Sequence, residues 1–354
     1  MKKKTLALLV FLVFMLLGSL VVGNWEKPDA AEKVYTWKCE SFLPESEPEH
    51  AVSFARFSKM VEENTNGQVK IKFYSAGAIV KVPELMSATR DGVLEMSVWS
   101  CGYGTGAIPL LGVIDGLPMS WRDTTEAAVI LYDLGLSELS RKAYANYGVH
   151  LLGHHVQSAC GLGMLARKPI RTLNDLKGLK VRTHGYFVDF WGKLGASTVT
   201  LPLADLYMAL ATKPVDACTL DWWSQGKVFK TAEIVKNGVL PSQIGCTVGH
   251  MVVNPKAWSS LPPDLQTIIT LTWREWAGWH QRYFHPYLRS SFESSKRELE
   301  KDWGVKFITQ PEVDQAKMLK VAMEIWDQVA AKAPLSAKGI DLIKDYYRKV
   351  GRIK

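Results

Sequence analysis

The chain has 354 residues, of which 47% are hydrophobic and 22% charged, a composition typical of a globular protein with room for two domains. Its formal net charge of +8 is spread along the chain, without a basic tract or an interleaved aromatic platform, which argues against a nucleic-acid-binding protein. A mildly positive field suits an anionic small ligand, but it identifies none by itself.

The N-terminal residues have the layout of a secretory signal peptide, because three lysines at 2–4 precede an apolar run at 6–22. Small residues at 21–23 and again at 29–31 offer two cleavage sites, so we expect an exported protein whose mature chain begins between residues 24 and 33. The apolar run is also close to the length of a membrane-spanning helix, and an uncleaved anchor is the alternative.

Five cysteines lie far apart in the sequence, and none belongs to a CxxC pair. An odd number without that spacing argues against both a disulfide framework and a zinc site. We interpret them as small buried residues at strand ends, and a single bridge between two of them is the alternative. They are Cys39, Cys101, Cys160, Cys218 and Cys246.

Strand and helix patterns alternate from residue 34 onwards. Residues 34–42 (VYTWKCESF) predict a strand, and residues 54–66 predict a helix with one apolar face. The alternating run at 68–74 (QVKIKFY) predicts a half-buried strand. Pro83 opens another helix, and residues 94–100 (LEMSVWS) form the next strand. This order predicts an α/β domain with helices packed on a mainly parallel sheet.

The same alternation restarts in the middle of the chain. Strands are predicted at 179–183 (LKVRT), 197–201 (STVTL) and 215–220 (VDACTL), with helices at 187–194 and 204–211 between them. This is a second βαβαβ unit, and it predicts a second lobe.

The last third of the chain supplies the covering helices. Residues from 264 to about 301 predict one very long helix, which Pro286 should kink and which is long enough to reach across two lobes. We interpret its aromatic stripe as packing rather than a site: Trp273, Trp276, Trp279 and Tyr283.

These patterns predict the division of the chain. Its parts are the signal peptide (1–23), a mature N-terminal segment (24–33), lobe I (34–156), lobe II (157–245), a return to lobe I (246–285) and C-terminal helices that belong mainly to lobe II (286–354).

Several catalytic and cofactor motifs are weak or missing. Residues 161–166 (GLGMLA) match a dinucleotide-binding pattern, but Pro169 prevents a regular helix after it and no acidic residue follows at the required distance. His154 and His155 are adjacent on a strand and therefore point to opposite faces, which favours a structural or hinge role over a metal site. No Ser-His-Asp arrangement, nucleophile elbow, HExxH motif or catalytic carboxylate pair occurs in the sequence. These absences favour a binding protein over an enzyme.

Arg182 lies at the carboxyl end of a predicted strand, the end at which open α/β sheets place their ligands. Its guanidinium is a rigid fork that matches a carboxylate and keeps its charge when desolvated. The alternative is an ordinary surface arginine.

Two long segments carry a family resemblance. Residues 169–185 (PIRTLNDLKGLKVRTHG) and 191–217 (WGKLGASTVTLPLADLYMALATKPVDA) resemble the solute-binding proteins of tripartite ATP-independent periplasmic (TRAP) transporters, the DctP family. Residues 65–77 (TNGQVKIKFYSAG) are similar to the early strand and loop of that family, and residues 109–119 (PLLGVIDGLPM) to the stretch that leaves its fourth strand. The similarity covers most of residues 34–260 in the family's order.

The resemblance implies an α/β, two-lobed periplasmic binding protein fold with the ligand cleft between the lobes and a long kinked helix spanning both. It further implies a periplasmic protein, not an enzyme, that binds a small organic acid and delivers it to the small and large subunits of a sodium-driven permease. We expect it to act as a monomer and without nucleic acid. The arginine of the family motif falls on Arg182, and the resemblance implies that Arg182 contacts the substrate carboxylate, with Gly185 letting the backbone turn closely beneath it.

The chain also departs from the family. Gly163 stands where members that bind sialic acid have a second arginine, and residues 219–223 (TLDWW) stand where many members have an asparagine. The contacts to sialic acid therefore do not transfer. In some 2-oxo-acid and lactate binders a cation bridges the ligand to a carboxylate near this strand end, and Asp221 is the candidate metal ligand for a bound sodium or calcium. No other cofactor is expected.

We expect the cleft to be aromatic, which suits a monocarboxylate with an apolar or aromatic body. Trp223 is expected to pack in the core instead. The candidate ligand contacts are Arg182, Trp99, Tyr103, Glu40, Phe42, Asp221 and Trp222.

Two other functions stay open at this point. One is a ligand-sensing subunit that presents its bound acid to a membrane receptor, and the other is a secreted enzyme that uses the same cleft. The lobes should close by hinge rotation at crossings near Gln157 and Gly245. Because an empty cleft would leave Arg182 in water, we expect its loss to have little effect on the ligand-free fold.

Overall fold

The computed structural model describes residues 33–353 apart from 48, 116, 122–123, 157–161, 221–225, 227–228, 242–246 and 289–291, and within 285–295 it describes no side chains. The chain divides into two compact units, Met1–Tyr35 and Thr36–Lys354, and the elements below belong to the second unit from Thr36 onwards. The predicted signal peptide, both cleavage sites, Cys160, Cys246 and the predicted hinges at Gln157 and Gly245 lie outside the described residues.

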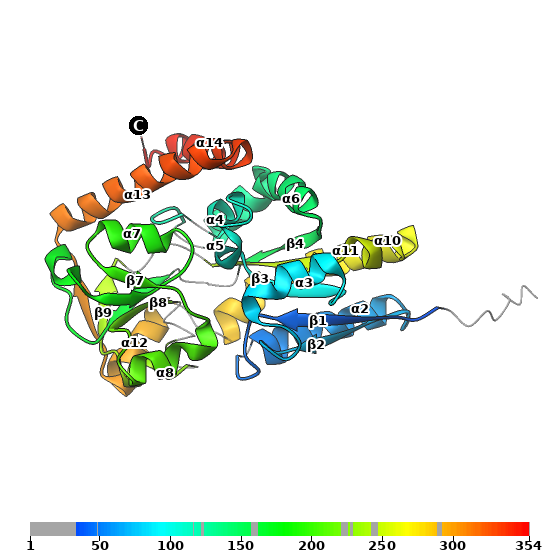
Figure 1. Cartoon of the computed structure of the whole chain (residues 1–354), viewed down its shortest axis with the longest axis horizontal. Coiled ribbons are helices and arrows are strands. Elements are labelled where there is room, and N and C mark those ends of the chain that lie inside the picture. Colours follow the sequence, from blue (N-terminus) through cyan, green and yellow to red (C-terminus); the bar gives the residue numbers. More distant parts are fainter. Residues whose placement is uncertain are drawn as a thin grey trace, which may run out of the picture. The chain divides into compact units, whose positions relative to one another are not determined.

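The first sheet has five strands in the order β2-β1-β3-β10-β4 (Figure 1). β1 pairs in parallel with β3, whereas β10 runs antiparallel to both β3 and β4. The predicted strands at 34–42, 68–74 and 94–100 are confirmed. The strands are β1 (Tyr35–Ser41), β2 (Val69–Tyr74), β3 (Met96–Ser100), β4 (His150–Val156) and β10 (Val248–Val253).

The second sheet has six strands in the order β11-β9-β5-β8-β6-β7. β6 runs parallel to β7 and β8, β11 runs parallel to β9, and β5 runs antiparallel to β8 and β9. One strand in each sheet, β10 in the first and β5 in the second, runs opposite to its neighbours, and the other strands whose direction these pairings give run the same way. The prediction of a mainly parallel sheet is therefore confirmed, with one antiparallel strand in each sheet. The strands are β5 (Gly163–Ala166), β6 (Lys180–Arg182), β7 (Ser197–Val199), β8 (Ala217–Leu220), β9 (Asn237–Leu240) and β11 (Lys306–Thr309).

The helices cover both sheets. The α-helices are α2 (Ala55–Asn64), α3 (Leu85–Asp91), α4 (Leu110–Ile114), α5 (Thr124–Ala128), α6 (Leu136–Tyr147), α7 (Phe187–Lys193), α8 (Leu206–Ala211), α10 (Pro255–Ser259), α11 (Pro263–Trp279), α12 (Phe292–Trp303), α13 (Glu312–Lys332) and α14 (Pro334–Lys349). Shorter 3-10 or π-helical turns are η1 (Glu49–Phe54), η2 (Val82–Glu84), η3 (Cys101–Gly104), η4 (Val129–Asp133), η5 (Leu173–Leu176), η6 (Leu203–Asp205), η7 (Thr231–Glu233) and η8 (His280–Leu288).

The predicted long helix is α-helical through α11 and changes to a π-helix in η8 before α12. Trp273 and Trp276 of its aromatic stripe are buried, and the Trp276 indole donates a hydrogen bond to the Ser53 carbonyl at 2.8 Å. Trp273 meets Phe57 of α2 edge to face. This part of the stripe therefore packs, as predicted. The kink at Pro286 stays a prediction.

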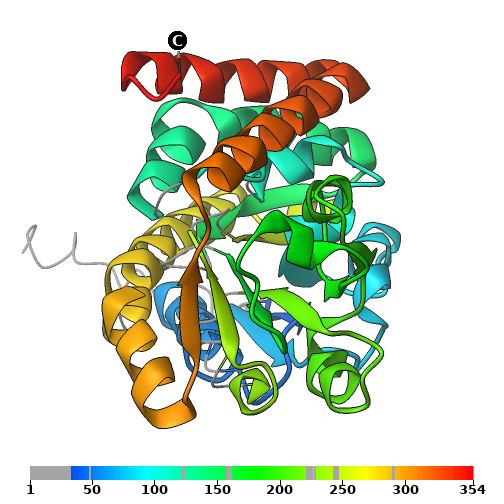
Figure 2. The same cartoon turned by 90° about the vertical axis from the view of Figure 1, so that its left-hand side faces the viewer.

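The C-terminal helices touch elements of both halves. α13 packs against α7, and α14 packs against α4 and α6; Figure 2 shows α13 leading from β11 to α14. The Trp326 indole of α13 donates to the Pro118 carbonyl at 3.0 Å. The predicted boundaries of the lobes stay a prediction.

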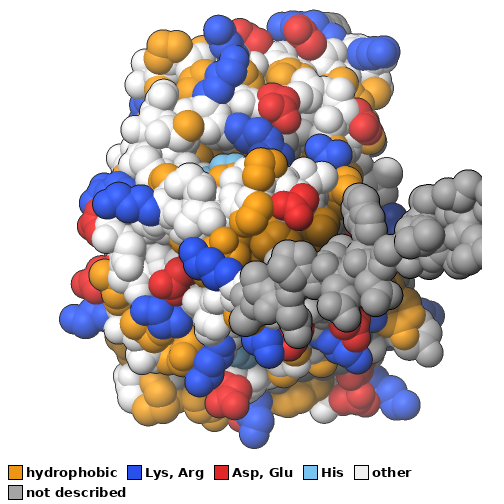
Figure 3. Space-filling view, turned by 90° about the vertical axis from the view of Figure 1, so that its right-hand side faces the viewer, with side chains coloured by type: hydrophobic (Ala, Val, Ile, Leu, Met, Phe, Trp, Pro, Cys, Tyr) orange, Lys and Arg blue, Asp and Glu red, His pale blue; other side chains and the backbone are white. Residues whose placement is uncertain are grey.

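The described residues contain no helix with the length and apolarity that a membrane span requires. On the face drawn in Figure 3, lysine and arginine side chains alternate with acidic and apolar ones, and the described surface there has no continuous basic patch. A nucleic-acid interface finds no support on this face.

Candidate ligand-binding site

Arg182 ends β6, a strand that lies between β7 and β8, and only 2% of it is exposed. Its Nε and Nη2 donate to the Leu201 carbonyl at 3.1 and 2.9 Å, and Nη1 approaches the Thr219 carbonyl at 3.4 Å. Backbone oxygens near the ends of the neighbouring strands thus fix the plane of the guanidinium. The alternative of a surface arginine is wrong, and so is the expectation that Arg182 lies in water.

The other half of the chain contributes Tyr103, which lies on η3 directly after β3. Its hydroxyl accepts a hydrogen bond from Arg182 Nη2 at 3.2 Å, and its ring lies 6.1 Å from that of Phe42. Phe42, Tyr103 and Arg182 therefore lie close together. A guanidinium has five N–H groups, and these four contacts leave one hydrogen on Nη1 without a partner among the described residues.

Two further residues of the site were not predicted. The His184 ring stacks on Tyr103 at 5.6 Å, and its Nε2 lies 3.6 Å from Asp115 Oδ2. Asp115 accepts a hydrogen bond from the Val248 amide at 2.9 Å. Neither ring nitrogen of His184 has a hydrogen-bond partner among the described residues, although the side chain is buried. The sequence could have indicated His184, because residues two apart in an extended segment face the same side and His184 lies two residues after Arg182.

Glycines allow the two halves to meet closely here. Gly185 has a φ of +58°, in the left-handed region that glycine adopts without strain. A Cβ on Gly102 would lie 2.3 Å from Asp115 Oδ2 and 2.5 Å from His184 Cδ2. A Cβ on Gly112 of α4 would lie 2.1 Å from the ring of Tyr186. The close contact between η3, α4 and the segment after β6 is therefore possible only because Gly102 and Gly112 have no side chain.

The remaining predicted contacts are held elsewhere or are not described. Both oxygens of Glu40 accept backbone hydrogen bonds, from Ile79 at 3.1 Å and Val80 at 2.9 Å. Trp99 is buried with its ring 5.2 Å from that of His250. Ligand contact by Glu40 and Trp99 stays a prediction. Asp221 and Trp222, like Trp223, lie outside the described residues.

The nearest thiol is not a nucleophile at neutral pH. Burial raises the pKa of Cys218 on β8 to about 12, although the charge of Arg182 lowers it in part. Only a thiolate attacks carbonyl carbon efficiently. Cys218 is therefore not suited to covalent chemistry at neutral pH.

Comparison with known proteins gives consistent matches. A family model described as bacterial extracellular solute-binding protein, family 7, matches residues 40–333. The solved TRAP periplasmic solute binding protein of Pseudoalteromonas atlantica, with bound sodium and pyruvate, is 27% identical, with a TM-score of 0.80 over 90% of this chain and 95% of that chain. The one of Colwellia psychrerythraea, with bound calcium and pyruvate, is 25% identical, with a TM-score of 0.78 over 90% of this chain and 95% of that chain.

Among curated proteins, a monocarboxylate 2-oxoacid-binding periplasmic protein of Nostoc sp. is 28% identical over 213 residues, which are 60% of this chain and 58% of that protein. The matches confirm the predicted two-lobed α/β fold.

Proposed function

The chain belongs to the bacterial extracellular solute-binding proteins of family 7, and we propose that it binds a small monocarboxylate at Arg182 for a TRAP transporter. The buried guanidinium carries this proposal. A charge that is 2% exposed is costly unless an anion or a full set of hydrogen bonds compensates it. Backbone carbonyls supply part of that compensation, and a carboxylate supplies the rest.

The geometry indicates how the carboxylate binds. Nε and one side of Nη2 are held by Leu201, so the remaining hydrogens lie on Nη1 and on the side of Nη2 that contacts Tyr103. One carboxylate oxygen takes the free Nη1 hydrogen. The other takes the place of the Tyr103 hydroxyl at Nη2, which gives the two parallel bonds of an arginine–carboxylate pair.

The surroundings favour a body with an apolar or unsaturated part. Phe42, Tyr103 and His184 present rings near the guanidinium, and such rings bind flat or apolar groups well. The ring nitrogens of His184, which have no hydrogen-bond partner among the described residues, suit a carbonyl or hydroxyl oxygen of the ligand. Pyruvate, which is bound in two similar proteins, and the 2-oxoacids bound by a third combine a carboxylate with a carbonyl group in this way.

A sodium or calcium ion beside the ligand belongs to the same proposal, since both occur with pyruvate in similar proteins. Such ions need oxygen ligands, and Asp221 is the carboxylate proposed for this role. The protein acts in the periplasm as a monomer, without catalysis, and delivers its ligand to the small and large permease subunits.

A thermal-shift screen tests the proposal. Monocarboxylates, dicarboxylates, sulfonates and aromatic acids are compared with neutral sugars, each with and without sodium and calcium. A ligand at one hundred times its Kd adds about 2.7 kcal/mol of apparent stability. We expect 2-oxo and aromatic monocarboxylates to give the largest shifts. Equal shifts from neutral sugars, or none from any acid, would contradict the proposal.

A further inference from the structure

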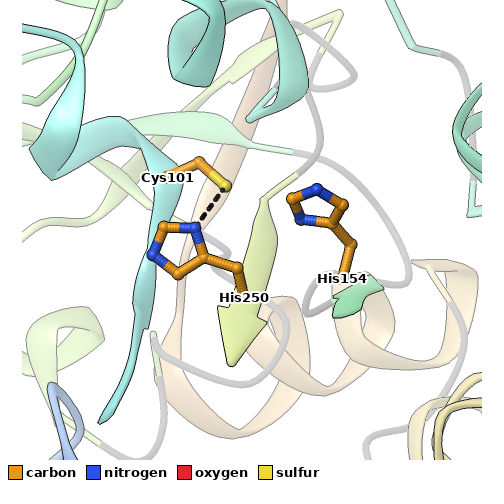
Figure 4. A group of neighbouring side chains, drawn as sticks. All are labelled: Cys101, His154 and His250. Carbon is orange, nitrogen blue, oxygen red and sulfur yellow. Dashed lines mark hydrogen bonds between the residues drawn. The ribbon is translucent and has the colours of Figure 1, made fainter. Parts of the chain in front are cut away.

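A second cluster of side chains lies within the first sheet's half of the protein. Cys101 of η3, His154 of β4 and His250 of β10 place one ligand atom each within 4.8 Å of one another, and all three are fully buried (Figure 4). The register explains their proximity, because His250 pairs directly with His154 across the antiparallel strands. Cys101 follows the end of β3, which borders β10 on its other side.

The donor atoms face one another. Cys101 Sγ lies 3.3 Å from His250 Nδ1. His154 Nε2 is hydrogen-bonded to the Ser140 hydroxyl at 2.7 Å, and this contact turns Nδ1 toward Cys101 and His250 (Figure 4). That Nδ1 is buried and has no hydrogen-bond partner among the described residues. A hydrogen bond at the far ring nitrogen is the usual means of orienting a metal-binding histidine.

We propose that Cys101, His154 and His250 bind one monovalent copper ion. A thiolate with two imidazoles is a soft ligand set that copper and zinc both accept. In a three-coordinate site, bonds of about 2.3 Å to sulfur and about 2.0 Å to nitrogen separate these two ligand atoms by about 3.7 Å, within about half an ångström of the 3.3 Å between Cys101 and His250. On binding, the Cys101 thiol releases its proton to solvent and the sulfur donates its electron pair to the ion.

Charge and ligand number select copper over zinc. Cu⁺ and one thiolate sum to zero, so a fully buried site carries no net charge. Zn²⁺ in the same site leaves a net positive charge, and structural zinc sites have four ligands. The Tyr144 hydroxyl lies 3.9 Å from Cys101 Sγ, but as a neutral oxygen it would not remove that charge.

A cavity adjoins the strand that carries His154. A cavity of about 420 Å³ between α6, β4 and α11 is lined by His154 together with Ser137, Arg141 and Trp273. An ion that enters this cavity reaches the strand that carries the first ligand.

The neighbouring cluster of Glu49, His155 and His280 does not carry the same inference. Glu49 Oε1 lies 2.9 Å from His155 Nε2 and 3.3 Å from His280 Nε2. Burial raises the pKa of Glu49, but hydrogen bonds from the two imidazoles outweigh it and leave that pKa well below its ordinary value. The three groups thus form a hydrogen-bonded network among themselves. As predicted, His154 and His155 join clusters on opposite faces of β4.

Competition for Cu⁺ tests the proposal. The exported protein, freed of metal and kept reduced without oxygen, is titrated with Cu⁺ against a chromophoric chelator, and with Zn²⁺ in a parallel series. We expect about one Cu⁺ per chain, held about tenfold or more tighter than Zn²⁺. Cys101→Ala and His154→Gln should each lose it. Cys218→Ala, which removes another fully buried thiol, should bind as the wild type does.

X-ray absorption of the copper-loaded wild type should report one sulfur and two nitrogen ligands, a readout that does not depend on how the variants fold. A wild type that cannot hold Cu⁺ against the chelator would overturn the proposal. So would a folded Cys101→Ala variant with unchanged copper content, or a spectrum with several sulfur ligands. Tighter Zn²⁺ binding would overturn the assignment to copper.

Discussion

Replacing Arg182 with alanine should lower the stability of the ligand-free protein and remove the proposed contact with the ligand. Arg182 donates two hydrogen bonds to the Leu201 carbonyl and one longer one to the Thr219 carbonyl. Hydrogen bonds to charged groups contribute about 1.5–3 kcal/mol each, and unsatisfied acceptors cost about 1–3 kcal/mol. Because Leu201 is partly solvated, we expect Arg182→Ala to lower the free energy of unfolding by about 2–4 kcal/mol. This replaces the sequence-based expectation of almost no change.

Arg182→Ala should also weaken binding of the ligand. Truncating one member of a buried charge pair costs about 2–5 kcal/mol, roughly thirtyfold to several-thousandfold in Kd. Arg182→Lys should recover part of it, since an ammonium cannot make two parallel bonds. Urea unfolding without ligand and calorimetry with the best acid from the screen measure the two effects. Lys180→Ala is the matched control, an exposed cation on the same strand. A folded Arg182→Ala variant that binds within about threefold of wild type would refute the site assignment, and unchanged stability would refute the hydrogen-bond reasoning.

Three further outcomes are expected. Gly112→Ala should abolish ligand-induced compaction in small-angle scattering and weaken binding about tenfold or more, because its Cβ would lie 2.1 Å from the Tyr186 ring; Gly192→Ala, with open space around it, should compact normally. Burial and the charge of Arg141 lower the pKa of His150 to about 4 from 6.5, so between these values the unfolded chain takes up a proton that the folded chain does not. Going from about pH 7.5 to about pH 5 should therefore cost the wild type about 1–2 kcal/mol more than His150→Gln in urea unfolding, and parallel losses would contradict this assignment. Mass spectrometry of the exported protein should find an N-terminus between residues 24 and 33, whereas an intact Met1 in the membrane fraction would support the anchor.

Local pattern was sufficient for most strands and for the position of Arg182. The alternation at 68–74 and the apolar run at 94–100 correspond to β2 and β3, because the spacing of apolar residues in the sequence directly reflects which side chains of a strand are buried. Strand direction was less accessible. Nothing local states that β10, which lies about a hundred residues after β4, enters antiparallel between β3 and β4.

Those residues of the candidate site whose positions depend on a single chain segment were accessible from the sequence. The structure brings together Arg182, which was proposed from its strand end, with Phe42 and Tyr103, which were proposed from their places after strands of the other lobe; ligand binding by the three stays a prediction. Asp115 was missed because its role depends on contact with His184 across the two halves, which no spacing within either segment encodes. The burial of Arg182 was not predicted for the same reason, because the carbonyls that accept its hydrogen bonds belong to Leu201 and Thr219, which lie in other segments of the chain.

The spacing of the cysteines gave no indication of the cluster that Cys101 forms with two histidines. Metal motifs are recognised when ligands lie a few residues apart, whereas Cys101, His154 and His250 meet only through the pairing of β10 with its neighbours. Cys101 and Tyr103 also share the short turn η3. An ion bound to Cys101 therefore restrains the same turn that presents Tyr103 to Arg182. If the ion changes the affinity for the acid by some factor, linkage requires the acid to change the affinity for the ion by the same factor. Measuring each affinity with and without the other ligand shows whether the two sites are coupled, and unequal factors would mean that one of the two was measured at the wrong site.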